Sequence, residues 1–316
     1  MLLSVVFSFR DEEEVLPELI KRLHNTLNPL DLTYELIFVN DASTDASLQL
    51  LLKHRDEDKR IKIINMSRRF GVAPCTMAGL QCAKGDAVVY MDTDLQDPPE
   101  LIPKLLEEFK KGVDVVNTTR IKRSGENAFK MWLTKKAYNL INSISDIDIP
   151  KNTGDFKLLS RRAVNEIVRL NEYDPFMRGL VRWVGFNQTQ VLYKREARFA
   201  GKAKFPLLKS LGPAKEFIRG LTSFSELPLY IALILGFLIS LGAFVYLIGI
   251  IITRVFMGMH KPGWPAIMVT MLFLGGTILF SIGVLGIYIG RIHHDIKNRP
   301  LYIIESKIGI DGEEAT

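Results

Sequence analysis

The stretch that decides the fold is Ala87-Val88-Val89-Tyr90-Met91-Asp92-Thr93-Asp94, a run of apolar and β-branched residues that ends in two aspartates. A short apolar run of this kind, bounded by polar residues, is typical of a buried strand in a parallel sheet. In such sheets, ligands bind beyond the carboxyl ends of the strands. The sequence therefore predicts a buried strand whose polar end lies at a binding site.

The same pattern recurs along the first 120 residues, where β-rich runs alternate with helical stretches. We expect strands at 3–9, 34–40, 61–66, 87–91 and 113–118, and helices at 13–26, 45–54, 72–83 and 100–110. This alternation predicts an open, largely parallel α/β sheet. Polar clusters also follow the first two strands, at Arg10-Asp11-Glu12 and Asn40-Asp41-Ala42-Ser43. Three clusters at one sheet edge predict a single site.

The aspartate pair, Asp92 and Asp94, is followed by Gln96, and together they offer the hard oxygen ligands that Mg²⁺ or Mn²⁺ prefers. Such ions commonly take one or two carboxylates and complete their coordination with water and phosphate oxygens. The pair therefore predicts a metal site that serves a diphosphate ligand. The alternative is a solvated turn with a helix-capping aspartate. The sequence has no Gly-rich phosphate loop and no dinucleotide fingerprint.

Two uncharged segments lie near the C-terminus, 27 residues at 227–253 and 29 residues between Lys261 and Arg291. A bilayer core needs about 20 apolar residues, so each segment is long enough to span it. Buried core helices are the alternative, but these segments are apolar on all sides. We expect two transmembrane helices, at about 227–253 and 264–290, that form an antiparallel hairpin.

Basic residues set the expected orientation, because they are more numerous outside the hairpin than in its short connector. Both termini and the soluble part should lie in the cytoplasm, at the inner (plasma) membrane. The segment Lys194–Arg219 holds eight Lys or Arg and two Glu, and its apolar residues favour amphipathic helices at the membrane interface over a nucleic-acid surface. The expected division is a catalytic domain at 1–204, interfacial helices at 205–226, transmembrane helices within 227–290 and a cytoplasmic tail at 291–316.

Three motifs give the sequence a specific family resemblance: Ser8-Phe9-Arg10-Asp11-Glu12, Val39-Asn40-Asp41-Ala42-Ser43-Thr44-Asp45 and 91–100, which reads Met-Asp-Thr-Asp-Leu-Gln-Asp-Pro-Pro-Glu. In order and spacing they resemble the nucleotide-sugar motifs of family 2 glycosyltransferases with a GT-A fold. The two spans and Asn152-Thr153-Gly154-Asp155-Phe156-Lys157-Leu158 look like those of polyisoprenyl-phosphate glycosyltransferases, the group of the bactoprenol glucosyltransferases and dolichyl-phosphate mannose synthase. The resemblance runs from Leu3 to about Tyr302.

The resemblance implies roles for individual residues. Glu12 and Asp41 would hold the nucleoside base and ribose, Asp92 would lie near the ribose and the metal, and Asp94 with Gln96 would bind the cation. Asp155 would be the general base. A phosphate monoester, however, has a second pKa of about 6 and is mostly dianionic at neutral pH, so Asp155 could instead orient the sugar or the phosphate.

An acceptor phosphate and a leaving diphosphate in one pocket need several cations to offset their repulsion. The candidates are Arg120, Lys135, Arg195, Arg198, Lys202 and Lys204, and the resemblance favours Arg120, Arg198 and Lys204. Solvated or lipid-headgroup contacts are the alternative for each of them.

The expected activity is inverting transfer of one sugar, glucose from UDP-glucose, to undecaprenyl or another polyprenyl phosphate. GDP-mannose, UDP-GlcNAc or a UDP-amino-arabinose derivative are alternative donors, and a catalytically silent membrane scaffold is the other alternative. Gly179 stands where processive synthases carry Gln in their Gln-x-x-Arg-Trp motif, which favours single addition. The resemblance also implies a homo-oligomer.

Overall fold

The computed structural model describes residues 1–121, 153–170, 172–196, 199, 222, 225–257 and 263–310. The chain divides into two compact units. One comprises Met1–Gly220 together with Pro300–Thr316, and the other comprises Leu221–Arg299. The first unit is an α/β domain and the second contains two long apolar helices.

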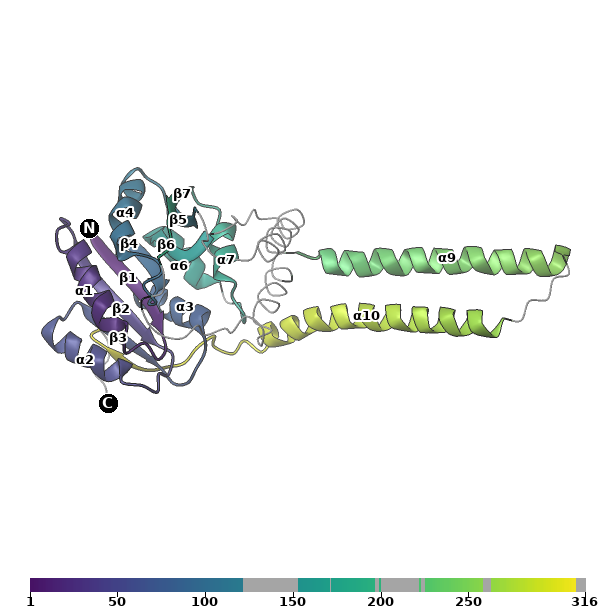
Figure 1. Cartoon of the computed structure of the whole chain (residues 1–316), viewed down its shortest axis with the longest axis horizontal. Coiled ribbons are helices and arrows are strands. Elements are labelled where there is room, and N and C mark those ends of the chain that lie inside the picture. Colours follow the sequence, from purple (N-terminus) through teal and green to yellow (C-terminus); the bar gives the residue numbers. More distant parts are fainter. Residues whose placement is uncertain are drawn as a thin grey trace. The chain divides into compact units, whose positions relative to one another are not determined.

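The α/β domain is built on one sheet with the strand order β7-β5-β6-β4-β1-β2-β3-β8 (Figure 1). Its centre consists of four parallel strands, β3 (Ile61–Met66), β2 (Thr33–Asn40), β1 (Leu2–Phe9) and β4 (Ala87–Asp92). Beyond β4, the strand β6 (Thr153–Ser160) is antiparallel and separates β4 from β5 (Val115–Arg120), which pairs in parallel with β7 (Gln188–Tyr193). At the other edge, β8 (Ile304–Ile308) pairs antiparallel with β3.

Helices cover both faces of this sheet (Figure 1). The helices α1 (Leu16–Leu27), α2 (Ser47–Glu57) and α4 (Ile102–Lys110), with the 3-10 turn η1 (Pro99–Leu101), lie on one face. The helices α3 (Val72–Cys82), α6 (Arg161–Arg169) and α7 (Met177–Trp183) lie on the other. The sheet is therefore enclosed, which explains why its central strands are apolar nearly throughout.

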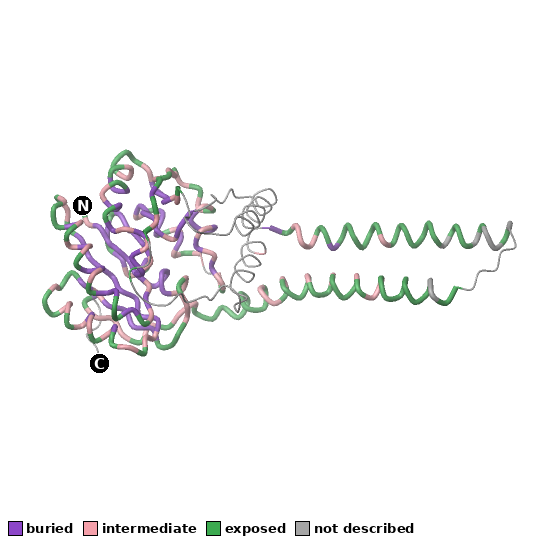
Figure 2. The backbone as a smooth tube through the Cα atoms, viewed as in Figure 1, coloured by how far each residue is buried: buried purple, intermediate pink, exposed green. Residues whose placement is uncertain are grey.

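Helix α1 shows how the sequence pattern produces this packing. Its buried residues Leu16, Leu19, Ile20 and Leu23 recur at the three- and four-residue spacing of one helix face. They share a core with alternate residues of β1, which all point to the same side of the sheet. These segments form the buried interior of the domain (Figure 2).

The expected parallel α/β architecture is confirmed, and the strands and helices predicted in the first 118 residues are all present with boundaries that shift by a few residues. The elements β6, α6, α7 and β7 were not predicted. The predicted tail at 291–316 needs correction, because 291–296 continue a helix and 304–308 form β8 within the sheet. Antiparallel pairing with the exposed edge of β3 explains this placement, since an unpaired strand edge is a template for another strand.

The second unit contains α9 (Leu227–Met257) and α10 (Trp264–Ile296), both longer than the predicted spans at 227–253 and 264–290. Their candidate membrane spans are Leu227–Ile250 and Ile267–Ile296, with mean hydropathies of 2.6 and 2.2. The apolar side chains of both helices are mostly exposed (Figure 2). Such surfaces suit hydrocarbon, so the two helices are candidates for association with a membrane.

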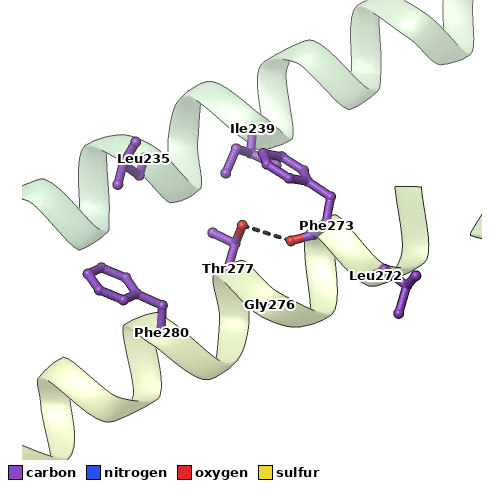
Figure 3. A pocket seen from close by; sticks show the side chains of 7 residues that line it. All are labelled: Leu235, Ile239, Leu272, Phe273, Gly276, Thr277 and Phe280. Carbon is purple, nitrogen blue, oxygen red and sulfur yellow. Dashed lines mark hydrogen bonds between the residues drawn. The ribbon is translucent and has the colours of Figure 1, made fainter. Parts of the chain in front are cut away.

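Leu235 and Ile239 of α9 face Phe273, Thr277 and Phe280 of α10 across an apolar cavity of about 410 Å³ (Figure 3). The hydroxyl of Thr277 donates to the carbonyl oxygen of Phe273 at 2.8 Å, so this polar group is satisfied within its own helix. The predicted interfacial segment 205–226 lies almost wholly outside the described residues.

Gly85 provides a test of the packing between β1 and β4. Its backbone N–H donates to Ser4 Oγ at 2.8 Å. A Cβ atom at this position would lie 2.6 Å from the Ser4 nitrogen and 2.7 Å from the Ala87 carbonyl oxygen, and neither backbone atom can rotate away. We expect Gly85→Ala to lower the free energy of unfolding by at least about 2 kcal/mol through overpacking. Thermal unfolding of the detergent-solubilised full chain would measure it.

The matched control is Gly236→Ala, where a Cβ meets nothing within 4 Å. The control should unfold at the temperature of the unchanged chain or slightly above it, because alanine favours helix. Equal unfolding temperatures for both variants would contradict the close approach at Gly85.

Candidate active site

The strand register brings the predicted polar clusters to one edge of the sheet. Phe9 pairs with Asn40 and Ser8 pairs with Asp92, so β1, β2 and β4 end side by side. Because β6 runs antiparallel to β4, its first residues lie at this same edge. Arg120, at the end of β5, pairs there with Tyr193 of β7. The edge therefore collects polar residues from six strands.

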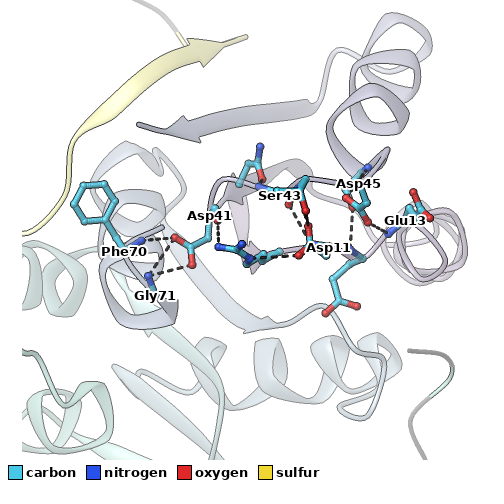
Figure 4. A network of polar contacts seen from close by, with 12 residues as sticks. Asp11, Glu13, Asp41, Ser43, Asp45, Phe70 and Gly71 are labelled. Carbon is cyan, nitrogen blue, oxygen red and sulfur yellow. Dashed lines mark hydrogen bonds and ion pairs between the residues drawn. The ribbon is translucent and has the colours of Figure 1, made fainter. Parts of the chain in front are cut away.

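The loops after β1 and β2 are joined by reciprocal hydrogen bonds (Figure 4). The Asp11 N–H donates to Ser43 Oγ at 3.1 Å, and the Thr44 N–H donates to Asp11 Oδ1 at 2.7 Å. Two residues further along, the Glu13 N–H donates to Asp45 Oδ2 at 3.1 Å. These bonds fix the two loops as one structure.

Glu12 and Asp41, the predicted nucleoside ligands, lie in these two loops and are 6% and 5% exposed. The Glu12 N–H donates to Ser47 Oγ at 2.9 Å. The Asp41 carboxylate accepts from the N–H of Phe70 at 2.6 Å and from the N–H of Gly71 at 3.1 Å (Figure 4). Asp41 therefore also holds the loop that leads into α3, and the nucleoside contacts of both residues stay predictions.

Negative charge is concentrated at the end of β4. Asp92 is the last residue of the strand, and Asp94 follows in a turn where its Oδ1 accepts the Gln96 N–H at 3.2 Å. Burial, then the charges of Asp155, Asp94 and Asp97, raise the pKa of Asp92 to about 7, and Arg195 opposes the shift. A carboxylate held in this environment gains strongly from a nearby cation.

This donor set fits a divalent ion whose coordination is completed by a substrate. Among the described residues, no three His, Cys, Asp or Glu side chains surround a common point. Mg²⁺ and Mn²⁺ sites at phosphate substrates commonly use one or two carboxylates with waters and phosphate oxygens. Asp92, Asp94 and Gln96 would hold such an ion.

The two arginines that pair with Asp97 bring positive charge to the same edge. It is fully buried, and the Tyr193 hydroxyl donates to its Oδ1. A guanidinium nitrogen of Arg120 lies 3.6 Å from Oδ2, and Arg195 Nε lies 3.5 Å from Oδ1. Burial alone would lower the pKa of Arg120, but Asp97 and Tyr193 raise it above its ordinary value. Asp97 thus forms ion pairs with two arginines at the site edge.

Asp155 lies near the start of β6 and forms a two-point ion pair with Arg178 of α7. Arg178 Nε lies 2.9 Å from Oδ1, and a second guanidinium nitrogen lies 2.6 Å from Oδ2. Burial would raise the pKa of Asp155, but Arg178, with help from Lys157 and Arg120, lowers it below its ordinary value. Asp155 is therefore ionised at neutral pH and is a weak base.

Lys157 lies on the same strand and is buried. Its Nζ donates to Asn117 Oδ1 at 2.7 Å, and burial lowers its pKa to about 7 although Asp155 opposes the shift. Asn117 Nδ2 donates to Gln188 Oε1 at 3.2 Å, and Gln188 Nε2 donates to the Val181 carbonyl oxygen at 3.0 Å. This chain of bonds attaches α7, and with it Arg178, to the sheet.

Of the predicted phosphate-binding residues, Arg120 and the further candidate Arg195 lie at the site edge, whereas Lys135, Arg198, Lys202 and Lys204 lie outside the described residues. Sequence reasoning missed the parts that Asp97, Tyr193, Arg178 and Lys157 play. Two signals were available. Tyr193 ends a β-rich run directly before Lys194-Arg195, and Lys157 stands between the apolar residues Phe156 and Leu158.

Comparison with known proteins finds glycosyltransferases that resemble this chain over most of its length. The model of "Glycosyl transferase family 2" matches residues 4–168. The uncharacterized glycosyltransferase YkcC of Bacillus subtilis is 43% identical over 98% of this chain and 95% of its own length.

Two further relatives carry more specific names. A prophage-derived bactoprenol glucosyl transferase of Shigella flexneri is 40% identical over 96% of this chain and 98% of its own. A prophage bactoprenol glucosyl transferase homolog of Escherichia coli is 38% identical over 96% of this chain and 99% of its own. With these matches and the sheet described above, the chain belongs to glycosyltransferase family 2 and is a glycosyltransferase with a GT-A-type domain.

Proposed function

We propose that the enzyme transfers a single glucose from UDP-glucose to undecaprenyl phosphate, or to a similar polyprenyl phosphate, at the cytoplasmic face of the membrane. The observation that carries this proposal is the similarity to the bactoprenol glucosyl transferase of Shigella flexneri, which covers 96% of this chain and so includes the two apolar helices. A soluble glycosyltransferase would not need the helices, whereas a prenyl acceptor resides in a bilayer.

The charges at the sheet edge support the chemistry. Glu12 and Asp41 would bind the nucleoside, and Asp92 and Asp94 with Gln96 would hold Mg²⁺ or Mn²⁺. When bound, the ion would neutralise the diphosphate that departs as UDP. Arg120 and Arg195, held in place by Asp97, would bind phosphate oxygens. Lys135, Arg198, Lys202 and Lys204 are proposed to add to this acceptor site.

In the proposed reaction, a phosphate oxygen of the lipid forms a bond to the anomeric carbon while the bond from that carbon to the UDP oxygen breaks. Attack from the opposite face inverts the anomeric configuration. A lipid phosphate has a second pKa of about 6 and is already a dianion at neutral pH, so no proton has to be removed. Asp155 would therefore orient the sugar or the phosphate and not act as the base.

The position of β8 supports a hairpin with both ends on one side of the membrane. β8 follows α10 in the chain and pairs with β3 of the catalytic sheet. The chain therefore leaves the catalytic domain before α9 and rejoins it after α10, so it crosses the membrane an even number of times. Basic residues flanking the pair, namely Lys209, Lys215, Arg219, Arg291, Lys297 and Arg299, favour the cytoplasmic side. Homo-oligomerisation stays a prediction.

The decisive assay uses the purified full chain with undecaprenyl phosphate, Mg²⁺ or Mn²⁺, and a panel of labelled UDP-glucose, UDP-GlcNAc, GDP-mannose and UDP-amino-arabinose donors. We expect labelled lipid from UDP-glucose. EDTA should abolish the signal, and Asp94→Asn should lower kcat by at least about 100-fold, because a metal at the leaving group supplies several kcal/mol. The unfolding temperature should change little. Labelled lipid from another donor alone would overturn the choice of glucose, and no labelled lipid would overturn the activity.

The role of Asp155 predicts a specific pH dependence. Because the pKa of Asp155 is lowered, the residue is ionised throughout pH 6 to 9. The range begins at pH 6 because the second pKa of the lipid phosphate is about 6. Asp155→Asn should reduce kcat by less than about 100-fold and keep the acidic limb of the pH–rate profile. Glu166→Gln, on the exposed face of α6, is the matched control and should change neither quantity. Loss of the acidic limb in Asp155→Asn alone would identify Asp155 as the base.

The proposed orientation can be tested by thiol labelling in a chain with Cys75→Ser and Cys82→Ser. A membrane-impermeant maleimide should label Met259→Cys, in the α9–α10 connector, in intact cells. Thr316→Cys should be labelled only after the membrane is permeabilised. Labelling of Thr316→Cys in intact cells would contradict the cytoplasmic placement of the C-terminus.

A further inference from the structure

A line of polar side chains crosses the site edge of the sheet from β8 to the loop after β2. In the strand register, Ser306 of β8 pairs with Asn65 of β3, and Asn65 pairs with Asn40 of β2. Asn65 Nδ2 donates to Ser306 Oγ at 2.9 Å, and Asn40 Nδ2 donates to Asn65 Oδ1 at 3.1 Å. Asn40 Oδ1 accepts the Ser43 N–H at 2.9 Å. We call the side chains of Ser306, Asn65 and Asn40 the amide relay.

The direction of the amide relay follows from its last bond. A backbone N–H can only donate, so Asn40 must present its oxygen to Ser43 and its NH₂ group to Asn65. Asn65 must then present its oxygen to Asn40 and its NH₂ group to Ser306. Asn40 and Asn65 are 4% and 7% exposed, so water is a poor substitute for these partners. The orientation of each amide therefore depends on its neighbour.

The loop after β2, which is bonded to the amide relay through Ser43, has an unfavourable backbone conformation. Ala42 has φ +53° and Asp11, in the adjoining loop, has φ +52°. Residues with a Cβ adopt this left-handed region only where surrounding contacts hold them there. The Ser43 N–H is bonded to Asn40 and its Oγ accepts the Asp11 N–H, so Ser43 connects the amide relay to both loops (Figure 4). Those loops carry Glu12 and Asp41.

We propose that Ser306 is a positioning residue for the nucleotide-sugar donor, acting through Asn65 and Asn40 on the loop at Asp41–Thr44. This inference rests on the proposed function, which makes Glu12 and Asp41 the nucleoside ligands. Its consequence is that the strand following the membrane hairpin is a component of the donor site. The donor site is therefore complete only when β8, which follows α10 in the chain, is paired with β3.

The test compares Ser306→Ala, Asn65→Ala and the double variant in the full chain, with UDP-glucose and Mn²⁺ as the probe. Loss of one neutral hydrogen bond should raise the donor KM and the UDP-glucose Kd by about 3-fold to 10-fold. The value of kcat and the KM for undecaprenyl phosphate should not change. Because both substitutions interrupt one chain of bonds, the double variant should show no more than the larger single effect. Ser306→Thr, which keeps the hydroxyl, should restore the donor KM.

The control is Glu305→Gln, an exposed neighbour on β8, which should leave the donor KM unchanged. A second readout needs no nucleotide. Hydrogen exchange of peptides covering 40–45 should be faster in Ser306→Ala than in the unchanged chain or Glu305→Gln. Unchanged exchange and an unchanged donor KM in Ser306→Ala, or additive effects in the double variant, would overturn the inference. If the unchanged chain binds no UDP-glucose but exchange still responds, the proposed donor fails while the link from β8 to the loop stands.

Discussion

Four carboxylates at one sheet edge, Asp92, Asp94, Asp97 and Asp155, are the constraint on which the rest of the site depends. Like charges in a partly buried site repel strongly, and burial together with this repulsion raises the pKa of Asp92. The neighbouring side chains offset this repulsion more for some of the four carboxylates than for others. Asp97 lies beside Arg120, Arg195 and Tyr193, and Asp155 is paired with Arg178, whereas the pKa of Asp92 stays raised, so a nearby cation would stabilise its carboxylate.

This unequal offset gives the site one part with arginines and another part with the aspartate pair. In the proposed function, the ion pairs with Asp97 hold Arg120 and Arg195 at the site edge, where they would bind phosphate oxygens. Lys157 contributes indirectly, because its bond to Asn117 begins the chain that holds α7 and Arg178. Asn117 of β5, Lys157 of β6 and Gln188 of β7 are thereby joined in one chain of hydrogen bonds.

The sequence was sufficient for elements whose signals are local. Val88 to Asp94 showed both a buried strand and its polar end, and parallel strands necessarily bring such ends to one edge. Partnerships between distant residues had no such signal. Tyr193 meets Asp97 across a separation of 96 residues, and Ser306 meets Asn65 across 241. The antiparallel insertion of β6 between β4 and β5 was equally hidden, because strand order follows from tertiary packing and not from hydrophobic period.

The electrostatics also bear on how Asp155 acts in the proposed reaction. A carboxylate whose pKa is lowered by Arg178 holds a proton weakly, so it is a poor general base for a nucleophile that is already a dianion. Glycosyl transfer, however, develops positive charge at the anomeric carbon in its transition state. In the proposed reaction, a fixed, ionised carboxylate near that carbon would stabilise such charge without moving, because it needs no reorganisation when the charge appears. Arg178 then has two consequences that agree: it keeps Asp155 ionised, and it fixes the direction in which the carboxylate points.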